Sequence, residues 1–400
     1  MARRPTPEKE VGGAGGTTPR GYMDMGFLRP LYESGAPVAS VHMDTSRDTT
    51  DADKKIELRW RHLREELAAL GTDETTLDVL EQAVGEGSSR SYGDHGQALF
   101  ASEGNLLGAH TLSEAPVQDR ASYLPIPDVL PLAVDRGRRL PYVLVALDRV
   151  NAKVTAYASH PTAEPVLEAD STGESLRNID GLGGRGGRGR RNNPGGPGAD
   201  SQAAQELWRE NTAKVAEHVR SAVRKVGAEL IIVGGDEEAI AYLRDNLGPR
   251  QLTTPIRIVP GGRGGTDAEE RLHKAAEDAL REFVVERHDA FLDDYQRKLA
   301  HDQAVRGTTP LLPMLSEARV ETLLLGAERD GEPELWGLFT EPLLVDTDPK
   351  GLDDPNGAFR APASALMLRS AVMADAAFTE LLDHGRTSAE SGATLRFPKQ

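Results

Sequence analysis

Apolar side chains recur along this chain with the spacings of short strands and amphipathic helices. The first third contains a strand at Val38–Met43, a helix over residues 53–70 and a second helix around Leu77–Val84 that two glycines close. Two more strands flank a turn at Glu103–Asn105. These elements predict a first domain of the α+β class.

The middle of the chain has the pattern of a sheet domain with helices. We predict strands at Tyr142–Leu147, Lys153–Ala158, Glu229–Val233 and Ile256–Val259, and a long helix over residues 200–226. Asp236 is suited to cap a helix between the last two strands. The strand–helix–strand order predicts a largely parallel core. Upstream, the prolines and basic residues of segment 125–139 predict a linker.

A long helix from Asp267 to about residue 300 leads into the last part of the chain. We predict strands at Val320–Leu325, Leu335–Phe339 and Ala393–Phe397, with helices around Met314–Arg319 and Ala363–Leu382. The fold class is therefore α/β, in three domains after a disordered tail. The predicted boundaries are 1–22 for the tail, 23–138 for the α+β domain, 139–287 for a mixed-sheet middle domain and 288–400 for a small α/β sandwich.

Composition narrows the classes of function. The chain has 400 residues, 47 basic and 63 acidic side chains and a net charge of −16, so any nucleic acid must be contacted by a local patch. It has no cysteine, which excludes disulfides, thiolate metal sites and a cysteine nucleophile. The opening residues lead into a polar tail and no apolar run is long enough for a bilayer, so we expect a cytoplasmic protein without membrane contact.

One segment departs from the acidic composition. Residues 181–198 hold nine glycines, four arginines and a single apolar side chain. Such a sequence buries too little apolar surface to offset the entropy of ordering, so we expect an exposed, flexible and cationic loop. Guanidinium groups on a flexible backbone suit phosphate or RNA. A linker without a partner is the plain alternative, but a long insertion inside a domain is usually functional.

Other candidate motifs are weaker. The glycine-rich turn Pro260–Asp267 precedes a helix and could hold an anion, but a flexible turn is the better interpretation, and no P-loop lysine follows. His288 and the carboxylates of Asp289, Asp293 and Asp294 do not share one helical face, which favours a solvated face over a metal site. No catalytic motif, cofactor motif or metal motif stands out.

The order of these parts resembles the archaeal and eukaryotic class-1 peptide-chain release factors, in the divergent bacterial branch of that superfamily. The resemblance covers residues 25–400 and is carried by Val38–Arg47, Leu58–Arg64, Tyr142–Tyr157 with the loop and helix after it, and Ala393–Phe397. In that superfamily a Gly-Gly-Gln loop of the middle domain acts at the peptidyl-tRNA ester. This chain has Gly183, Gly184 and Arg185 in the corresponding stretch and lacks the stop-codon motif Asn-Ile-Lys-Ser.

The resemblance implies the ribosomal A site as the docking place, and the departures argue against codon-directed peptide release. We therefore expect a ribosome hibernation factor, not an enzyme, that binds 70S ribosomes through rRNA. Relatives in the hibernation branch associate with elongation factor Tu, so the resemblance implies that partner too. The expected RNA-binding residues are Arg177, Gly183, Gly184, Arg185, Gly186, Gly187, Arg188, Gly189, Arg190, Arg191 and Asn192. A ribosome-rescue peptidyl-tRNA hydrolase, a tRNA-cleaving relative and an adaptor unrelated to ribosomes stay open as alternatives.

Overall fold

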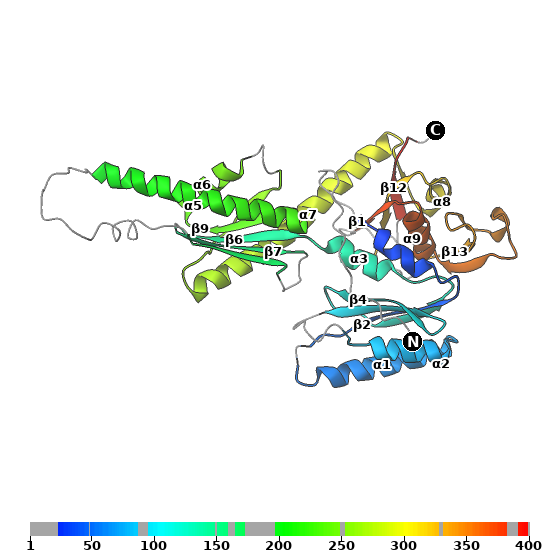
Figure 1. The fold of residues 1–400 in the computed structure, drawn as a ribbon. Coiled ribbons are helices and arrows are strands. Elements are labelled where there is room, and N and C mark those ends of the chain that lie inside the picture. Colours follow the sequence, from blue (N-terminus) through cyan, green and yellow to red (C-terminus); the bar gives the residue numbers. More distant parts are fainter. Residues whose placement is uncertain are drawn as a thin grey trace, which may run out of the picture. The chain divides into compact units, whose positions relative to one another are not determined.

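The computed structural model of the chain describes residues 23–47, 49–86, 95–148, 150–158, 165–172, 197–248, 253–327, 331–381 and 391–398. These residues form two compact units. The first unit holds residues 140–286, and the second combines residues 20–139 with residues 287–400. Sheets and helices are mixed throughout (Figure 1), which confirms the predicted α/β class. The three domain boundaries stay a prediction, because the first and last predicted domains share one unit here.

The first unit is built on a five-stranded sheet of order β10-β9-β6-β7-β8. Its strands are β6 (Tyr142–Leu147), β7 (Asn151–Tyr157), β8 (Leu167–Thr172), β9 (Leu230–Gly235) and β10 (Ile256–Ile258). β6, β9 and β10 run parallel, whereas β7 and β8 are antiparallel to their neighbours. The sheet is therefore mixed rather than largely parallel. The short turn after Asp148 forces β7 back beside β6, since a parallel return needs a long crossover.

Helices cover both faces of this sheet. They are α5 (Pro197–Val226), α6 (Glu237–Leu247) and α7 (Thr266–Ala300). α5 and α6 pack on one face, where Val219, Ile231 and Leu243 are buried. The part of α7 that lies in this unit packs on the other face with Leu272 and Leu280. The alternation of side chains along each central strand supplies both cores, as expected for a sheet buried on both faces.

The second unit begins with a four-stranded antiparallel sheet of order β4-β3-β2-β5. Its strands are β2 (Val38–Asp44), β3 (Gly96–Ser102), β4 (Asn105–Leu112) and β5 (Arg120–Leu124). Figure 1 shows α1 (Ala52–Ala69) and α2 (Glu74–Ala83) against one face, where Trp60, Leu63 and Leu77 are buried. The other face joins a core shared with residues 305–395 through Phe100. The predicted strand, two helices and hairpin of this region are confirmed.

The rest of the second unit contains two sheets. The larger has the order β1-β16-β12-β17-β11 and the smaller the order β14-β13-β15. The strands are β1 (Met23–Asp24), β11 (Ala304–Arg306), β12 (Val320–Leu325), β13 (Glu334–Gly337), β14 (Val345–Asp346), β15 (Phe359–Pro362), β16 (Ala377–Glu380) and β17 (Ser391–Leu395). The helices are η1 (Gly26–Tyr32), α3 (Leu130–Arg138), α8 (Thr308–Ser316), η4 (Pro349–Gly351) and α9 (Ala363–Met373).

Two sequence predictions are wrong in this unit, and one helix begins earlier than expected. The predicted linker 125–139 contains α3, whose Leu130, Leu132 and Ala133 are buried. The predicted helix over residues 363–382 ends at Met373, because Asp375 adopts a left-handed backbone (φ +52°) and β16 follows. β1 pairs with β16, which no sequence pattern predicted. The helix expected at residues 314–319 begins earlier, at Thr308.

Candidate RNA-binding site

All sequence-predicted RNA-binding residues lie outside the described residues. They are Arg177, Gly183, Gly184, Arg185, Gly186, Gly187, Arg188, Gly189, Arg190, Arg191 and Asn192. The structure describes the strand before these residues and the helix after them. The segment leaves the edge strand β8 after Thr172 and rejoins the chain at Pro197, where α5 begins.

α5 carries its first turns beyond the sheet (Figure 1). Among the described side chains of α5, the first buried ones are Asn211 and Thr212. At 1.5 Å per residue, the helix before them is roughly 20 Å long. Farther along, α6 holds α5 through two contacts. The Asn246 side chain donates to Thr212 Oγ1 at 3.0 Å, and Arg220 donates to the Asn246 carbonyl at 3.2 Å. The segment after Thr172 therefore joins a helix that α6 holds through Thr212 and Arg220.

Four glycines close the carboxyl end of the sheet by tight packing. A Cβ on Gly235 (φ +149°) would lie 1.8 Å from the Leu147 carbonyl oxygen, and one on Gly262 (φ +155°) would lie 2.7 Å from the Gly235 Cα. A Cβ on Gly234 would lie 2.5 Å from Leu272 of α7, and a Cβ on Gly261 would lie 2.4 Å from the same residue. These glycines allow the turn after β9 and the turn after β10 to touch backbone to backbone. The glycine-rich turn 260–265 is thus a packing element.

The basic side chains near the turn after β10 are already paired with carboxylates. Arg263, in the turn after β10, pairs with Asp170 of β8 at 3.1 Å, and Lys153 of β7 pairs with Glu168 at 3.0 Å. The first turn of α7 carries Asp267 and Glu269. Two of its amide groups donate to the Gly265 carbonyl. Local negative charge opposes an anion at this helix start, so a turn fits better than an anion site, and the close packing of Gly261 and Gly262 explains its glycines.

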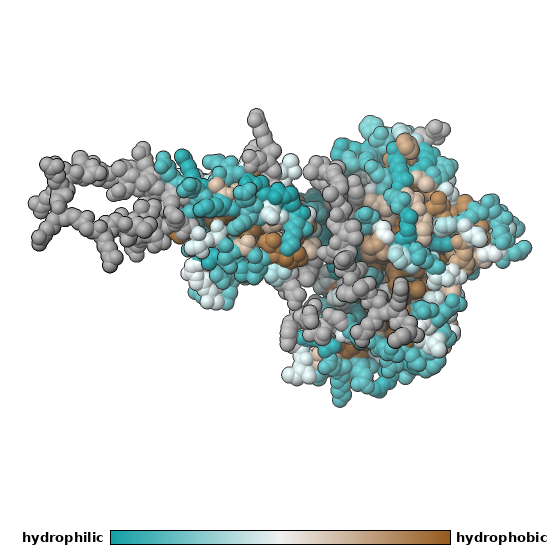
Figure 2. All heavy atoms as spheres, in the orientation of Figure 1, coloured by the Kyte–Doolittle hydropathy of each residue, from teal (hydrophilic) through white to brown (hydrophobic). Residues whose placement is uncertain are grey.

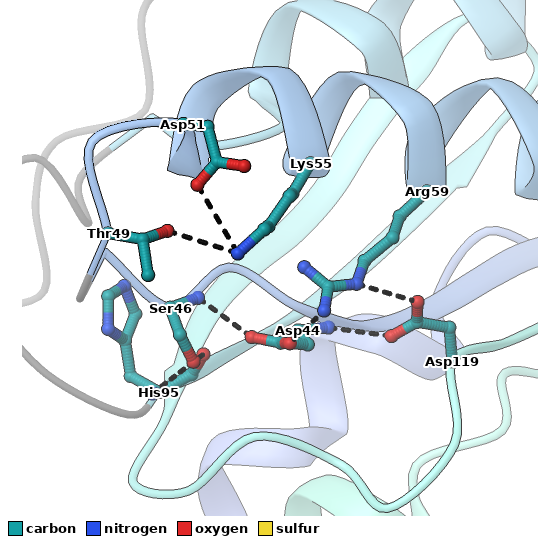
Figure 3. A network of polar contacts seen from close by, with 8 residues as sticks. All are labelled: Asp44, Ser46, Thr49, Asp51, Lys55, Arg59, His95 and Asp119. Carbon is teal, nitrogen blue, oxygen red and sulfur yellow. Dashed lines mark hydrogen bonds and ion pairs between the residues drawn. The ribbon is translucent and has the colours of Figure 1, made fainter.

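The second unit contains a polar network that the sequence did not single out (Figure 3). Asp44, at the end of β2, accepts a hydrogen bond from the Ser46 amide at 2.8 Å and pairs with Arg59 of α1. The Asp44 amide donates to Asp119 at 2.8 Å, and Arg59 also reaches Asp119 at 3.4 Å. The Ser46 hydroxyl and the backbone of His95 exchange two hydrogen bonds, at 3.1 and 3.2 Å. One arginine thus holds two carboxylates from different strand ends.

Hydrogen bonds and a neighbouring charge favour the ionised form of Asp44. Burial by itself would raise the pKa of Asp44, but hydrogen bonds from Ser46 and the charge of Arg59 outweigh burial and lower it. Beside it, Lys55 of α1 pairs with Asp51 at 3.3 Å and donates to Thr49 at 3.2 Å. The network ties the β2–α1 connection to α1 and to the sheet. Nothing in the local sequence identified Asp119 or His95 as partners of Asp44 and Ser46.

In the described parts of the chain, no three His, Asp or Glu side chains converge in a geometry that could hold a metal ion. His288 is buried and its Nε2 lies 3.1 Å from the Glu380 carbonyl oxygen, so it is not on a solvated face. None of the helices in the described ranges has the length and apolar character that a bilayer span requires.

Part of the chain matches a known protein family. Residues 141–301 match the model of bacterial archaeo-eukaryotic release factor family 2. The match runs from β6 to the end of α7 and includes the connection between β8 and α5. The chain is also similar to the uncharacterized protein Rv2629 of Mycobacterium tuberculosis, with 27% identity over 301 residues, 75% of this chain and 77% of the relative. The family match supports a relationship to the release-factor-like superfamily.

The solved structures to which this chain is similar include proteins from archaea and yeast. The archaeal translation termination factor aRF1 is 13% identical, with a TM-score of 0.23 over 93% of this chain and 96% of that chain. Archaeoglobus fulgidus Pelota is 12% identical, with a TM-score of 0.32 over 76% and 79%. Saccharomyces cerevisiae Dom34, a translation termination-like factor, is 10% identical, with a TM-score of 0.41 over 76% and 79%.

Proposed function

We propose that this protein binds the 70S ribosome and occupies its A site through rRNA contacts without hydrolysing peptidyl-tRNA. One observation carries the proposal. The release-factor family model matches residues 141–301, and inside that match the connection between β8 and α5 carries Gly183, Gly184 and Arg185 instead of Gly-Gly-Gln. The arrangement favours a factor that keeps the docking part of a release factor and has replaced its catalytic glutamine.

The chemistry of arginine supports occupancy rather than catalysis. A neutral amide can orient water, whereas a guanidinium stays protonated and cannot act as a base at neutral pH. A guanidinium is instead a strong partner for phosphate oxygens. Residues 181–198 contain four arginines and no carboxylate, inside a chain of net charge −16. Attraction to RNA would therefore be concentrated at this segment, which would favour one docking orientation.

The finer assignment is a hibernation factor, similar to the ribosome hibernation factor Balon and its relatives. Such a factor would fill the tRNA site of idle ribosomes, with elongation factor Tu as the implied partner. Support comes from the release-factor similarity combined with the missing Gly-Gly-Gln motif and the missing codon-reading motif. Co-sedimentation of the chain with 70S ribosomes in the presence and absence of elongation factor Tu tests this partner.

The decisive experiment is ribosome pelleting at several salt concentrations. One variant replaces Arg177, Arg185, Arg188, Arg190 and Arg191 by alanine. If all five contact phosphate, the wild-type chain should show a salt slope of log affinity steeper by about 3.5 to 4.5 than the variant. The matched control replaces five exposed cations of the same unit: Arg224, Lys225, Arg244, Arg271 and Arg281. Equal losses in both variants, or no loss in the first, would refute the role of the segment.

A rescue hydrolase or tRNA-cleaving relative is the second candidate, and the release-factor match favours it. Arginine and backbone amides can stabilise a developing oxyanion or phosphorane. The assay is incubation of purified protein with stalled peptidyl-tRNA on ribosomes. Peptide release or tRNA cleavage above background, lost on Arg185→Ala, would replace occupancy by catalysis. An adaptor unrelated to ribosomes would instead stay at the top of a ribosome gradient.

A further inference from the structure

One asparagine of the second unit is followed directly by a glycine. Asn356 and Gly357 lie in the segment between η4 and β15, and the pair Asn-Gly occurs nowhere else in the chain. Both residues are exposed. Beside β13, where Figure 1 draws this part of the chain in orange, Figure 2 shows hydrophilic residues at the surface. The asparagine is therefore in contact with water, and the residue after it has no side chain that would crowd it.

The Asn356 side chain is not held by a hydrogen bond. In the described parts of the chain its amide group has no hydrogen-bond partner, and neither has the backbone amide of Gly357. Other asparagines are restrained. Asn105 donates to a backbone carbonyl at 3.0 Å, and Asn246 donates to Thr212 Oγ1 at 3.0 Å. Asn105 and Asn246 are each followed by a leucine, so Asn356 differs from them in its freedom and in its neighbour.

The turn itself requires the glycine. Asp354 Oδ1 accepts a hydrogen bond from the Asn356 backbone amide at 3.2 Å. A Cβ on Gly357 would lie 2.5 Å from Asp354 Oδ2, so the carboxylate occupies the place where another side chain would begin. The turn is anchored at both ends, because Leu352 is buried and Phe359 packs against the shared core. The same glycine that fits this turn leaves the backbone nitrogen after Asn356 accessible.

These features suit an intramolecular reaction of the asparagine. The backbone nitrogen of Gly357 attacks Cγ of Asn356, a new N–C bond forms and the bond from Cγ to Nδ2 breaks. Ammonia leaves, and the proton lost by the Gly357 amide balances the one that the ammonia gains. Water then opens the resulting succinimide at either carbonyl and yields aspartate or isoaspartate. Because the two reacting groups are neighbours in one chain, the step needs no second protein.

We propose that Asn356 is a site of spontaneous deamidation, at which the folded protein accumulates aspartate and isoaspartate. Either product adds one negative charge beside residues 346–354, which already carry four aspartates and one lysine. Isoaspartate also lengthens the backbone just before β15, the strand that pairs with β13. The modified chain becomes a substrate for the class of enzyme that methylates isoaspartyl carboxylates. This inference does not depend on the proposed ribosomal function.

The test incubates the full chain in neutral buffer and follows its peptides by mass spectrometry. The peptide that contains Asn356 should acquire the mass of an amide converted to a carboxylic acid. The peptides that contain Asn105 and Asn246 are internal controls from the same samples and should keep their masses. The rate at Asn356 should rise about tenfold per pH unit, because the deprotonated fraction of the attacking amide does so. A purified isoaspartyl methyltransferase with a labelled methyl donor detects the isoaspartate product.

Two variants and a reference peptide complete the experiment. Gly357→Val should slow the reaction by about tenfold or more, because a β-branched side chain crowds the attacking nitrogen. Asn356→Gln should abolish methyl incorporation in this segment, since its longer side chain cannot close the same ring. Circular dichroism melting checks that both variants fold. A synthetic peptide of residues 351–360 gives the rate without the fold, and the folded chain should react at a comparable rate.

Two results would overturn the proposal. One is a reference peptide that deamidates while the folded chain stays amidated, because the turn would then protect Asn356. The other is an equal rate at Asn356 and at Asn105 in the folded chain, because the free side chain and the glycine would then have no effect. Neither result bears on the ribosomal function, since the pelleting experiment depends on five arginines of the first unit.

Discussion

Arg138 and Glu380 form a two-pronged ion pair, with Nε and one terminal nitrogen of the arginine each 2.7 Å from a carboxylate oxygen. The pair joins the last turn of α3 to the end of β16, and the Glu380 side chain is only 8% exposed. Nearby, Arg287 donates to the Gly137 carbonyl at 3.3 Å. The hydrogen bond to Glu380 raises the pKa of Arg138 above its ordinary value. A stretch that resembles a linker in sequence is thereby held firmly in place.

Glu380→Gln should destabilise the second unit by about 2 kcal/mol, because the neutral amide leaves the arginine without its charged partner. Urea unfolding followed by circular dichroism measures the loss. Glu317→Gln, which breaks the exposed pair with Arg319, is the control and should cost less than about 0.5 kcal/mol. Equal stability of the two variants would show that burial of Glu380 adds nothing.

Gly235→Ala should destabilise the first unit by more than about 3 kcal/mol. The new Cβ would lie 1.8 Å from the Leu147 carbonyl oxygen, and backbone on both sides leaves little room to yield. Gly264→Ala is the matched control, since Gly264 also has a positive φ (+138°) but its Cβ would meet open space. Thermal melting of both variants isolates the clash from the backbone strain. A Gly235→Ala chain that melts with the control would contradict the close packing of the two turns.

Asp73→Ala should cost about 1 kcal/mol at neutral pH, because Asp73 caps α2. Hydrogen bonds from the Thr75 and Thr76 side chains lower the pKa of Asp73 from 3.8 to about 2. A lowered folded pKa stabilises the fold above the unfolded pKa, and this contribution is lost as the pH falls through the folded pKa. The difference between wild type and variant should therefore shrink below about pH 4 and vanish near pH 2.

The pH dependence of Asp73→Ala is read from urea unfolding at several pH values. Asp293→Ala, at an exposed position on α7, serves as the control. A stability difference for Asp73→Ala that stays constant down to pH 2 would mean that the carboxylate is not what caps the helix.

Leu28→Ala should destabilise the second unit by about 3 kcal/mol, since Leu28 of η1 is fully buried in the core shared by the two ends of the chain. Met23 pairs with Phe378 across β1 and β16, so loosening η1 should also raise amide hydrogen exchange in β16. Leu70→Ala, at a half-exposed leucine after α1, should change neither quantity. Unchanged exchange in β16 would show that residues 23–32 do not stabilise the C-terminal sheet.

The amino-acid sequence by itself determined the elements that neighbours in the chain create. The hairpin of β6 and β7 follows from two apolar runs around a turn, where Asp148 accepts hydrogen bonds from the amides of Val150 and Asn151. Asp236 caps α6 as expected, accepting from two amides of its first turn. The sequence also marks residues 181–198 as a cationic segment, because composition alone carries that information. It equally supplies the release-factor resemblance.

Only the tertiary structure decided the features that join distant residues. No local sequence pattern predicts three of these contacts. They are the pairing of Met23 with Phe378, the ion pair between Arg138 and Glu380, and the contacts of Arg59 with Asp44 and Asp119. The glycine-rich turns look flexible in sequence, yet backbone contacts between them require the missing side chains. Local preferences act over a few residues, whereas these contacts form only when the whole chain has folded and buries its apolar surface.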